Sequence, residues 1–304
     1  MHKPDHPLNI TNPLFVYNPA AGLKNKDHVL RLYAKVCQRY GWQGCIHETK
    51  EGEEINRIVR EYIQQGCDVI FAGGGDGTIS SVVTALVGTN IPMAIIQLGT
   101  GNLLARFLKI PMQTEQALCY INQQTSVKQL NALHVKNRYA VLNGSVGFSS
   151  NLIKNTSRKE KRRYGMFAYI WRGLQIIIGI QPYKFNLVID GKAYTARASE
   201  IYITNPTVLI EEIFLKNLPP DSLNAPFVMF IVKARTLRDY LGLVLDILLG
   251  RVNQSPRMTC VLIQNSIKIS TKRPITVQAD GEVIGQTPVT IQVIRNAVKL
   301  IIPS

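Results

Sequence analysis

Residues 71–78 read Phe-Ala-Gly-Gly-Gly-Asp-Gly-Thr, and this stretch decides how the first half of the chain folds. The apolar run Asp68–Ala72 leads into the glycines, and Ile79–Val87 follows with apolar residues at helical spacing. An apolar run, a cluster of glycines and a periodic segment predict a strand, a tight turn and a helix. Residues 68–87 therefore form a strand–turn–helix unit of the kind found in α/β proteins.

The composition of this turn points to phosphate chemistry. Glycines let backbone N–H groups approach a polyanion closely, and the start of a helix adds the positive end of its dipole. Asp76 would repel bare phosphate. It fits if it binds a metal that bridges phosphates, orients a donor of the loop, or takes a proton from an acceptor hydroxyl. The turn matches neither the G-x-x-x-x-G-K-S/T phosphate loop nor the G-x-G-x-x-G dinucleotide motif, and a glycine turn without a ligand is the alternative.

The overall composition predicts a folded protein with an anionic partner. Of the 304 residues, 46% are hydrophobic and 18% are charged, which supplies real cores and too little charge for disorder. The formal net charge of +15 implies nucleotide phosphates, an anionic membrane surface or nucleic acid as a partner. Nucleic acid is the weakest of these, because no reader motif is present and aromatic residues do not interleave with the basic ones.

Cysteines, histidines and apolar stretches predict a reduced, cytoplasmic protein without a metal cluster. The five cysteines form no C-x-x-C pair, and the five histidines show no metal-binding spacing. The N-terminal residues lack the apolar segment of a signal peptide. The longest apolar stretches, Met166–Ile180 and Tyr240–Leu249, are shorter than the ~20 residues that span a bilayer.

The order of patterns along the chain predicts two domains. From residue 10 to 132, short apolar runs alternate with helical patterns, which indicates a Rossmann-like α/β domain with a mostly parallel sheet. From residue 133 to 304, short alternating runs separated by turn residues indicate an antiparallel β-rich domain, whose last strand could return to the first domain. Two helical segments interrupt the second domain, Tyr164–Ile178 and Leu237–Leu249.

Three small-residue turns in the first half form a set. Asn18–Gly22, Gly73–Thr78 and Gly99–Asn102 each follow a short apolar run. In a parallel sheet the carboxyl ends of the strands lie on one edge, where ligands of open α/β folds bind. The turns offer backbone donors, hydroxyls and amides with almost no bulk, so together they favour a ligand more strongly than one turn alone.

An acidic pair stands near the C-terminus. Asp280 and Glu282 flank a glycine, and side chains two apart in a strand point to the same face, so two carboxylates would converge. One could hold a metal while the other receives a proton. The alternative is a plain hairpin turn, because Asp-Gly is a strong hairpin dipeptide. Asp190-Gly191 also lies between strand patterns, but no acid follows two residues on, and we interpret it as a plain turn.

A basic segment predicts a contact with a membrane. Six cations lie between Lys154 and Arg163 with only Glu160 opposing, and the apolar and aromatic segment Met166–Ile178 follows directly. A cationic patch beside such a segment is what an enzyme resting on anionic lipid would carry. The alternative is a solvated basic loop followed by a core helix.

Several motifs together resemble one family, the diacylglycerol kinase catalytic-domain family, which includes bacterial diacylglycerol kinases, YegS-type lipid kinases and sphingosine kinases. The resemblance covers about Leu14 to Pro303. Its markers are Asn18–Gly22, Gly74–Thr78, Leu98–Asn102, Asn143–Phe148, Tyr164–Tyr169 and Asp280–Glu282.

The resemblance implies an ATP-dependent, Mg²⁺-requiring kinase that phosphorylates a lipid hydroxyl, with a two-domain fold like that of NAD kinases. It implies that Glu282 is the proton acceptor with Asp280 beside it, and that Asp76 acts on the phosphate and metal side. The implied nucleotide site comprises Asn18, Pro19, Ala20, Ala21, Gly22, Thr49, Gly74, Gly75, Asp76, Gly77, Thr78, Ile79, Ser80 and Thr100. The protein would associate peripherally with an anionic membrane.

Two departures from the family pattern keep other functions open. Ser80-Ser81 stands where the family usually has an acid, and Asn224-Ala225-Pro226 replaces an Asp-Asp-Gly linked to a structural Mg²⁺. The alternatives are an NAD kinase-like enzyme, which shares Gly-Gly-Asp-Gly-Thr, and a non-catalytic protein that binds nucleotide and membrane. The sequence names neither the lipid nor the oligomeric state.

Overall fold

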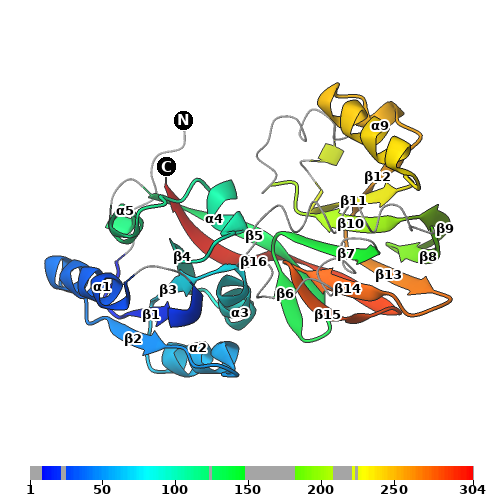
Figure 1. Cartoon of the computed structure of the whole chain (residues 1–304). Coiled ribbons are helices and arrows are strands. Elements are labelled where there is room, and N and C mark those ends of the chain that lie inside the picture. Colours follow the sequence, from blue (N-terminus) through cyan, green and yellow to red (C-terminus); the bar gives the residue numbers. More distant parts are fainter. Residues whose placement is uncertain are drawn as a thin grey trace. The chain divides into compact units, whose positions relative to one another are not determined.

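The structure is a computed structural model that describes residues 9–21, 25–122, 125–147, 182–207, 221–222 and 225–303. These residues form two compact units (Figure 1). Unit 1 comprises residues 1–132 and 295–304, and unit 2 comprises residues 133–294. The expected helix Tyr164–Ile178 and the basic segment Lys154–Arg163 lie outside the described residues.

Unit 1 contains the predicted parallel sheet. Strands β1 (Pro13–Tyr17), β2 (Cys45–Glu48), β3 (Val69–Gly74) and β4 (Pro92–Gln97) lie in the order β2-β1-β3-β4, all parallel. The end of β16 (Val289–Pro303) runs parallel to β4 as a further strand. Residues of β1, β3 and β4 are buried throughout, as expected for a sheet covered on both faces.

Helices cover both faces of this sheet, as Figure 1 shows. Helix α1 (Lys26–Tyr40) lies against α5 (Thr114–Cys119), and α2 (Ile55–Gln64) lies against α3 (Asp76–Leu86). The chain leaves β1 toward β2 on one side and then crosses to β3 on the other side. The order in which strands are added therefore reverses between β1 and β3, and this switch point is where doubly wound sheets bind ligands.

The strands of unit 2 form a six-stranded antiparallel sheet and the antiparallel part of a ten-stranded sheet. One has six strands in the order β12-β11-β10-β7-β14-β15, and the other includes the start of β16 with β13, β8 and β9. The strands are β7 (Asn143–Gly147), β8 (Tyr183–Ile189), β9 (Lys192–Ala198), β10 (Glu200–Thr204), β11 (Phe227–Val232), β12 (Met258–Ile263), β13 (Ser266–Thr271), β14 (Thr276–Ala279) and β15 (Glu282–Gln286).

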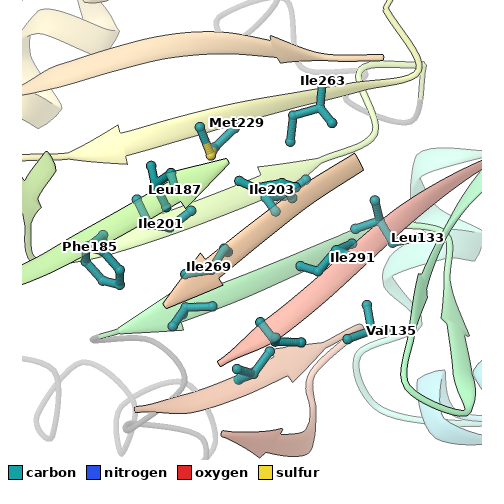
Figure 2. Packing of buried hydrophobic residues seen from close by; sticks show 14 of the residues in the cluster. Leu133, Val135, Phe185, Leu187, Ile201, Ile203, Met229, Ile263, Ile269 and Ile291 are labelled. Atoms are coloured by element: carbon teal, nitrogen blue, oxygen red, sulfur yellow. The ribbon is translucent and has the colours of Figure 1, made fainter. Parts of the chain in front are cut away.

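A large apolar core lies within the described part of unit 2. Along β8, Phe185, Leu187 and Ile189 are buried while the residues between them are exposed, so the period-two pattern of the sequence places one face inward. They pack with side chains from the other sheet, among them Ile201 and Met229 (Figure 2). Helix α9 (Leu237–Leu248) lies in the described part of unit 2. Its bounds match the predicted range Leu237–Leu249 within one residue.

Two strands differ from the sequence expectation. The alternating runs Thr290–Val293 and Val298–Ile302 predict two separate strands, but β16 runs unbroken through both. Asn296 lies between the two runs and adopts a φ of 49°. Its amide donates to Asn131 Oδ1 at 3.0 Å, and the strand continues past this irregular residue. Strand β5 (Thr125–Val135) was not predicted, because its first half is polar and shows no clear alternation.

Candidate functional site

Three strand ends of unit 1 lie side by side at one edge of the sheet. Tyr17 of β1 is in register with Gly73 of β3, and Gly73 is in register with Ile96 of β4. The predicted small-residue turns lie at these strand ends, although Gly73 and Gly74 of the second turn are still part of β3. The parallel sheet therefore brings them to the same edge, which is the arrangement that the sequence indicated.

Asn18 ties the turn after β1 to the start of α3. Its amide N–H donates to Gly73 O at 2.8 Å, and its side-chain Nδ2 donates to Thr78 Oγ1 at 2.8 Å. Its Oδ1 accepts from the Ala20 amide at 2.9 Å. Asn18 thus orders its own turn. It also holds the Thr78 hydroxyl across the switch point between β1 and β3.

The glycines let the turns after β3 and β4 approach each other. A Cβ on Gly99 would lie 2.5 Å from Gly75 Cα, and a Cβ on Gly74 would overlap the Thr78 side chain. Helix α3 starts here, with Gly75 as its N-cap. The first amides of a helix have no partner within the helix, and no described residue accepts from the Gly77 amide. The start of α3 can therefore receive an anion on its backbone.

Asp76 links this helix start to the turn after β4. Its Oδ1 accepts from the amide of Leu103 at 2.7 Å, and Leu103 is the first residue of α4 (Leu103–Phe107). A Cβ on Gly101 would lie 2.6 Å from the other oxygen, Oδ2. Burial raises the pKa of Asp76, although backbone hydrogen bonds from Leu103 and Asn102 act in the opposite direction. The donor that Asp76 holds thus belongs to the turn after β4 and not to its own glycine turn, and the three roles considered for Asp76 stay predictions.

Asn102 stabilises the third turn. Its Oδ1 accepts from the Gly99 amide at 3.1 Å, and its Nδ2 donates to Gly99 O at 2.7 Å. It adopts a φ of 49°, in the left-handed region that asparagine tolerates better than most residues. The turn is thus locked by its own side chain, and Thr100 at its tip is exposed.

The other residues implied as a nucleotide site lie at or behind the same edge. Pro19 and Ala20 are exposed in a short helical turn, and Thr49 follows β2 with its amide bonded to Tyr17 O at 2.9 Å. Ile79 and Ser80 are buried in α3, so their contribution would be through packing. Gly22 lies outside the described residues.

In unit 2, Asp280 forms a turn rather than a strand bend. Asp280 and Gly281 have φ values of 46° and 82°, and they connect β14 to β15 as a two-residue hairpin. The Asp280 carboxylate accepts three consecutive backbone amides, from Val141 at 2.9 Å, Leu142 at 3.0 Å and Asn143 at 2.9 Å. Its own amide donates to Asn143 O at 3.0 Å, and the residue is only 7% exposed.

Asp190, which we interpreted as a plain turn, has the same geometry. Its φ is 47°, and its carboxylate accepts three consecutive amides, from Gln264 at 2.9 Å, Asn265 at 2.7 Å and Ser266 at 2.9 Å. Its amide donates to Ser266 O at 3.0 Å. The chain thus uses one Asp-Gly turn twice, and the shared role of both aspartates is to hold a neighbouring segment.

Glu282 starts β15 and has a different partner. Arg138 Nη1 of β6 (Arg138–Ala140) donates to Glu282 Oε2, and the two side chains are 50% and 35% exposed. The segment 138–143 therefore holds both members of the acidic pair, the aspartate by backbone amides and the glutamate by a guanidinium. The two carboxylates thus have different protein partners, three backbone amides for Asp280 and one guanidinium for Glu282.

Sequence reasoning missed two residues of this arrangement. Arg138 carries no local signal, since its partner is 144 positions away. Gln278 is buried, and its Oε1 accepts from the Gly281 amide at 2.9 Å while its Nε2 donates to Asn143 Oδ1 at 3.0 Å. The sequence did carry a signal for Gln278, because it is a polar residue within a short strand pattern directly before the Asp-Gly dipeptide.

The acidic residues could bind a metal ion only if a bound ligand supplied further oxygen atoms. Within the described ranges, no three His, Cys, Asp or Glu side chains gather as a metal site. Asp76 could supply one carboxylate oxygen, and Mg²⁺ is commonly held by one or two carboxylates plus substrate phosphates. The residues therefore fit a Mg²⁺ ion carried by a nucleotide. The departure at Asn224 lies outside the described residues.

The α/β unit with glycine turns at its switch point and the antiparallel β unit both match models of one class of kinases. The chain belongs to the diacylglycerol kinase catalytic-domain family. Residues 12–132 match the diacylglycerol kinase catalytic domain, and residues 144–302 match the YegS C-terminal NAD kinase beta sandwich-like domain. The resemblance drawn from the motifs is confirmed.

Curated relatives and solved structures agree with this assignment. A "Probable lipid kinase YegS-like" of Alcanivorax borkumensis is 26% identical, covering 86% of this chain and 88% of the relative. The "Diacylglycerol kinase" of Bacillus subtilis is 25% identical, covering 90% of both chains. A diacylglycerol kinase structure from Bacillus anthracis has a TM-score of 0.76 at 21% identity, covering 97% of this chain and 98% of that one.

A more distant structure shares the fold. Yeast NADH kinase in complex with NADH has a TM-score of 0.53 at 11% identity, covering 97% of this chain and 83% of that one. The predicted two-domain fold, like that of diacylglycerol kinases and NAD kinases, is confirmed, and so is the expectation that the chain is a kinase.

Proposed function

We propose that this protein transfers the γ-phosphate of ATP to a hydroxyl group of a membrane lipid, either diacylglycerol or a sphingoid- or ceramide-like lipid. The observation that carries the proposal is the assembly at the switch point of unit 1. There the start of α3 presents backbone amides, and Asn18 and Asp76 tie it to the two neighbouring turns. A site of this kind suits a polyphosphate, and the chain belongs to a family of lipid kinases.

On the nucleotide side, the first turn of α3 would receive phosphate oxygens. The amides of Gly75 and Gly77 and the Thr78 hydroxyl are the donors, and Asn18 fixes that hydroxyl. Mg²⁺ carried by the nucleotide supplies charge neutralisation during phosphoryl transfer. Asp76 would offer it one carboxylate oxygen while the other accepts from Leu103. Phosphoryl transfer needs mainly positioning and electrostatic stabilisation, and a preorganised set of turns provides both.

On the acceptor side, Glu282 would take the proton from the lipid hydroxyl. Its ion pair with Arg138 is partly exposed, and such pairs contribute only about 0–1 kcal/mol, so the carboxylate can exchange it for a hydroxyl at little cost. Asp280 would not react itself, because its oxygens accept three backbone amides. It would position Glu282 by fixing the turn that precedes it.

An NAD kinase-like activity is the second candidate, because yeast NADH kinase shares the fold. Membership of the diacylglycerol kinase family favours a lipid acceptor over a dinucleotide. A non-catalytic protein that binds nucleotide and membrane is the third. This third candidate stays open because Ser80-Ser81 stands where the family usually has an acid. Ser81 Oγ donates to Gly77 O at 3.0 Å within the helix, so its hydroxyl proton is used there.

A transfer assay separates the three. The purified chain is incubated with radiolabelled ATP and Mg²⁺, together with diacylglycerol, sphingosine, ceramide or NAD, and each product is identified by mass. We expect label in one lipid and none in NAD, and a loss of at least about a hundredfold in kcat for Glu282→Gln. Label in NAD alone, or ATP binding without transfer to any acceptor, would refute the proposal. Full activity of Glu282→Gln would refute its role as proton acceptor.

A further inference from the structure

Helix α9 of unit 2 carries an exposed apolar face. Leu237, Leu241, Val244, Leu245 and Leu248 are each between 43% and 64% exposed, and Leu249 follows directly at 53%. Successive helical residues are about 100° apart, so the five side chains within the helix fall in an arc of about 100°. An exposed stripe of leucines on one helix marks an interaction surface rather than scattered surface apolar residues.

The other side of α9 already has partners in unit 2. Leu243 is buried, and Tyr240 donates its hydroxyl proton to Ser199 Oγ at 2.9 Å. Arg257 lies over Gly242, and its Nη1 pairs with Asp246 at 3.0 Å. The helix is therefore held in place by one face, while its leucine stripe is a separate face (α9 is the yellow-orange helix in Figure 1).

The charges around α9 are arranged to favour an anionic partner. The stretch from 233 to 251 holds four cations, which lie before, beside and after the stripe: Lys233, Arg235, Arg238 and Arg251. All four are exposed. The two acids of the stretch are committed elsewhere, because Asp239 accepts from the Thr236 amide at 3.0 Å in a capping box and Asp246 pairs with Arg257.

We propose that α9 docks the protein on a bilayer that contains anionic lipids, with its leucines entering the interface and its arginines contacting headgroups. A leucine face flanked by cations is the pattern of helices that lie in a membrane interface. The choice of a lipid partner rests on the proposed function. A symmetric dimer through the same face is disfavoured, because it would bring the same four cations of two copies together.

The test is sedimentation of the full chain with vesicles of phosphatidylcholine, with and without phosphatidylglycerol. For Leu241→Gln/Leu248→Gln we expect binding to the anionic vesicles to fall at least about tenfold. For Arg238→Gln/Arg251→Gln we expect a fall of about tenfold on anionic vesicles and no change on neutral ones. The matched control is Val188→Gln/Tyr194→Gln, which changes two exposed apolar residues of β8 and β9 and should bind as the native chain does.

The outcomes separate docking from catalysis, because sedimentation needs no turnover. Vesicle binding that depends on α9 in a chain that phosphorylates no lipid supports docking and refutes the proposed function. Unchanged binding of Leu241→Gln/Leu248→Gln overturns the docking proposal. The same variant converting a dimer to a monomer, as measured by analytical ultracentrifugation, with no loss of vesicle binding, also overturns it and assigns the face to self-association.

Discussion

The two Asp-Gly turns of unit 2 provide an internal control for the role of Asp280. In Asp280→Asn, the side-chain oxygen can still accept from Leu142 and Asn143, but an NH₂ group then faces the Val141 amide. One hydrogen bond to a charged acceptor is lost and two donors oppose each other. Such a loss costs about 1.5–3 kcal/mol, so we expect about 2 kcal/mol less free energy of unfolding.

Asp190→Asn makes the same change at the other turn, where Asn265 and Ser266 share one oxygen and Gln264 contacts the other. We therefore expect the same loss of about 2 kcal/mol, measured by urea unfolding. The two variants should differ in activity. If Asp280 positions Glu282, Asp280→Asn lowers kcat at least about tenfold, whereas Asp190→Asn leaves it unchanged.

Two results would refute this reasoning. Equal kcat values for both variants would show that the turn before Glu282 does not position the proton acceptor. A normal free energy of unfolding for Asp280→Asn would show that the three amides do not depend on the carboxylate. The two substitutions change equivalent hydrogen bonds at two different turns. If destabilisation alone lowered activity, both variants would therefore lose activity.

Three further predictions concern the neighbours of these carboxylates and the turns of unit 1. Arg138→Gln should change the free energy of unfolding by less than about 1 kcal/mol, because its ion pair is half exposed. It should nevertheless lower kcat if the guanidinium orients Glu282. The matched control is Arg57→Gln, which breaks the exposed pair with Glu61 and should leave kcat unchanged. Burial raises the pKa of Asp76, so this carboxyl stabilises the fold below its unfolded pKa of about 4, and the contribution is lost as pH rises through its folded value. Asp76→Asn should therefore match or exceed the native chain in thermal stability at neutral pH, lose that advantage below pH ~4, and lose transfer activity; a fall in stability at neutral pH would contradict this. Gly99→Ala should lower the free energy of unfolding by about 1–3 kcal/mol because its Cβ would lie 2.5 Å from Gly75 Cα, whereas Gly75→Ala meets only an ordinary contact at 3.6 Å and should unfold as the native chain does.

The local elements of this fold could be predicted from the sequence because their causes are local. The glycines at 73–75 end β3 and start α3, and the alternation at Tyr183–Ile189 gives β8 its buried face. The parallel order of the first half follows from the alternation of strands and helices. Strand β5 was missed for the opposite reason, since pairing with other strands, and not its own pattern, makes it a strand.

The contacts within the candidate site could not be predicted, because they join residues far apart in the chain. Asp76 accepts from an amide 27 positions later, and Asn18 reaches a hydroxyl 60 positions later. A carboxylate in a glycine turn suggested metal binding, proton transfer or the orientation of a donor of the loop, but a backbone donor at the next strand end was an equally good partner. Only the register of the sheet decides between them.

Comparison of the two Asp-Gly turns also separates what the fold requires from what chemistry requires. Both turns need the aspartate, since each holds three amides, and both need the glycine at positive φ. Neither needs an acid two residues on, because Lys192 occupies that position at the first turn and the same hydrogen bonds form. Glu282 is therefore not explained by the hairpin. Its carboxylate is partly exposed and pairs with Arg138, a setting that suits the proton-acceptor role proposed for it.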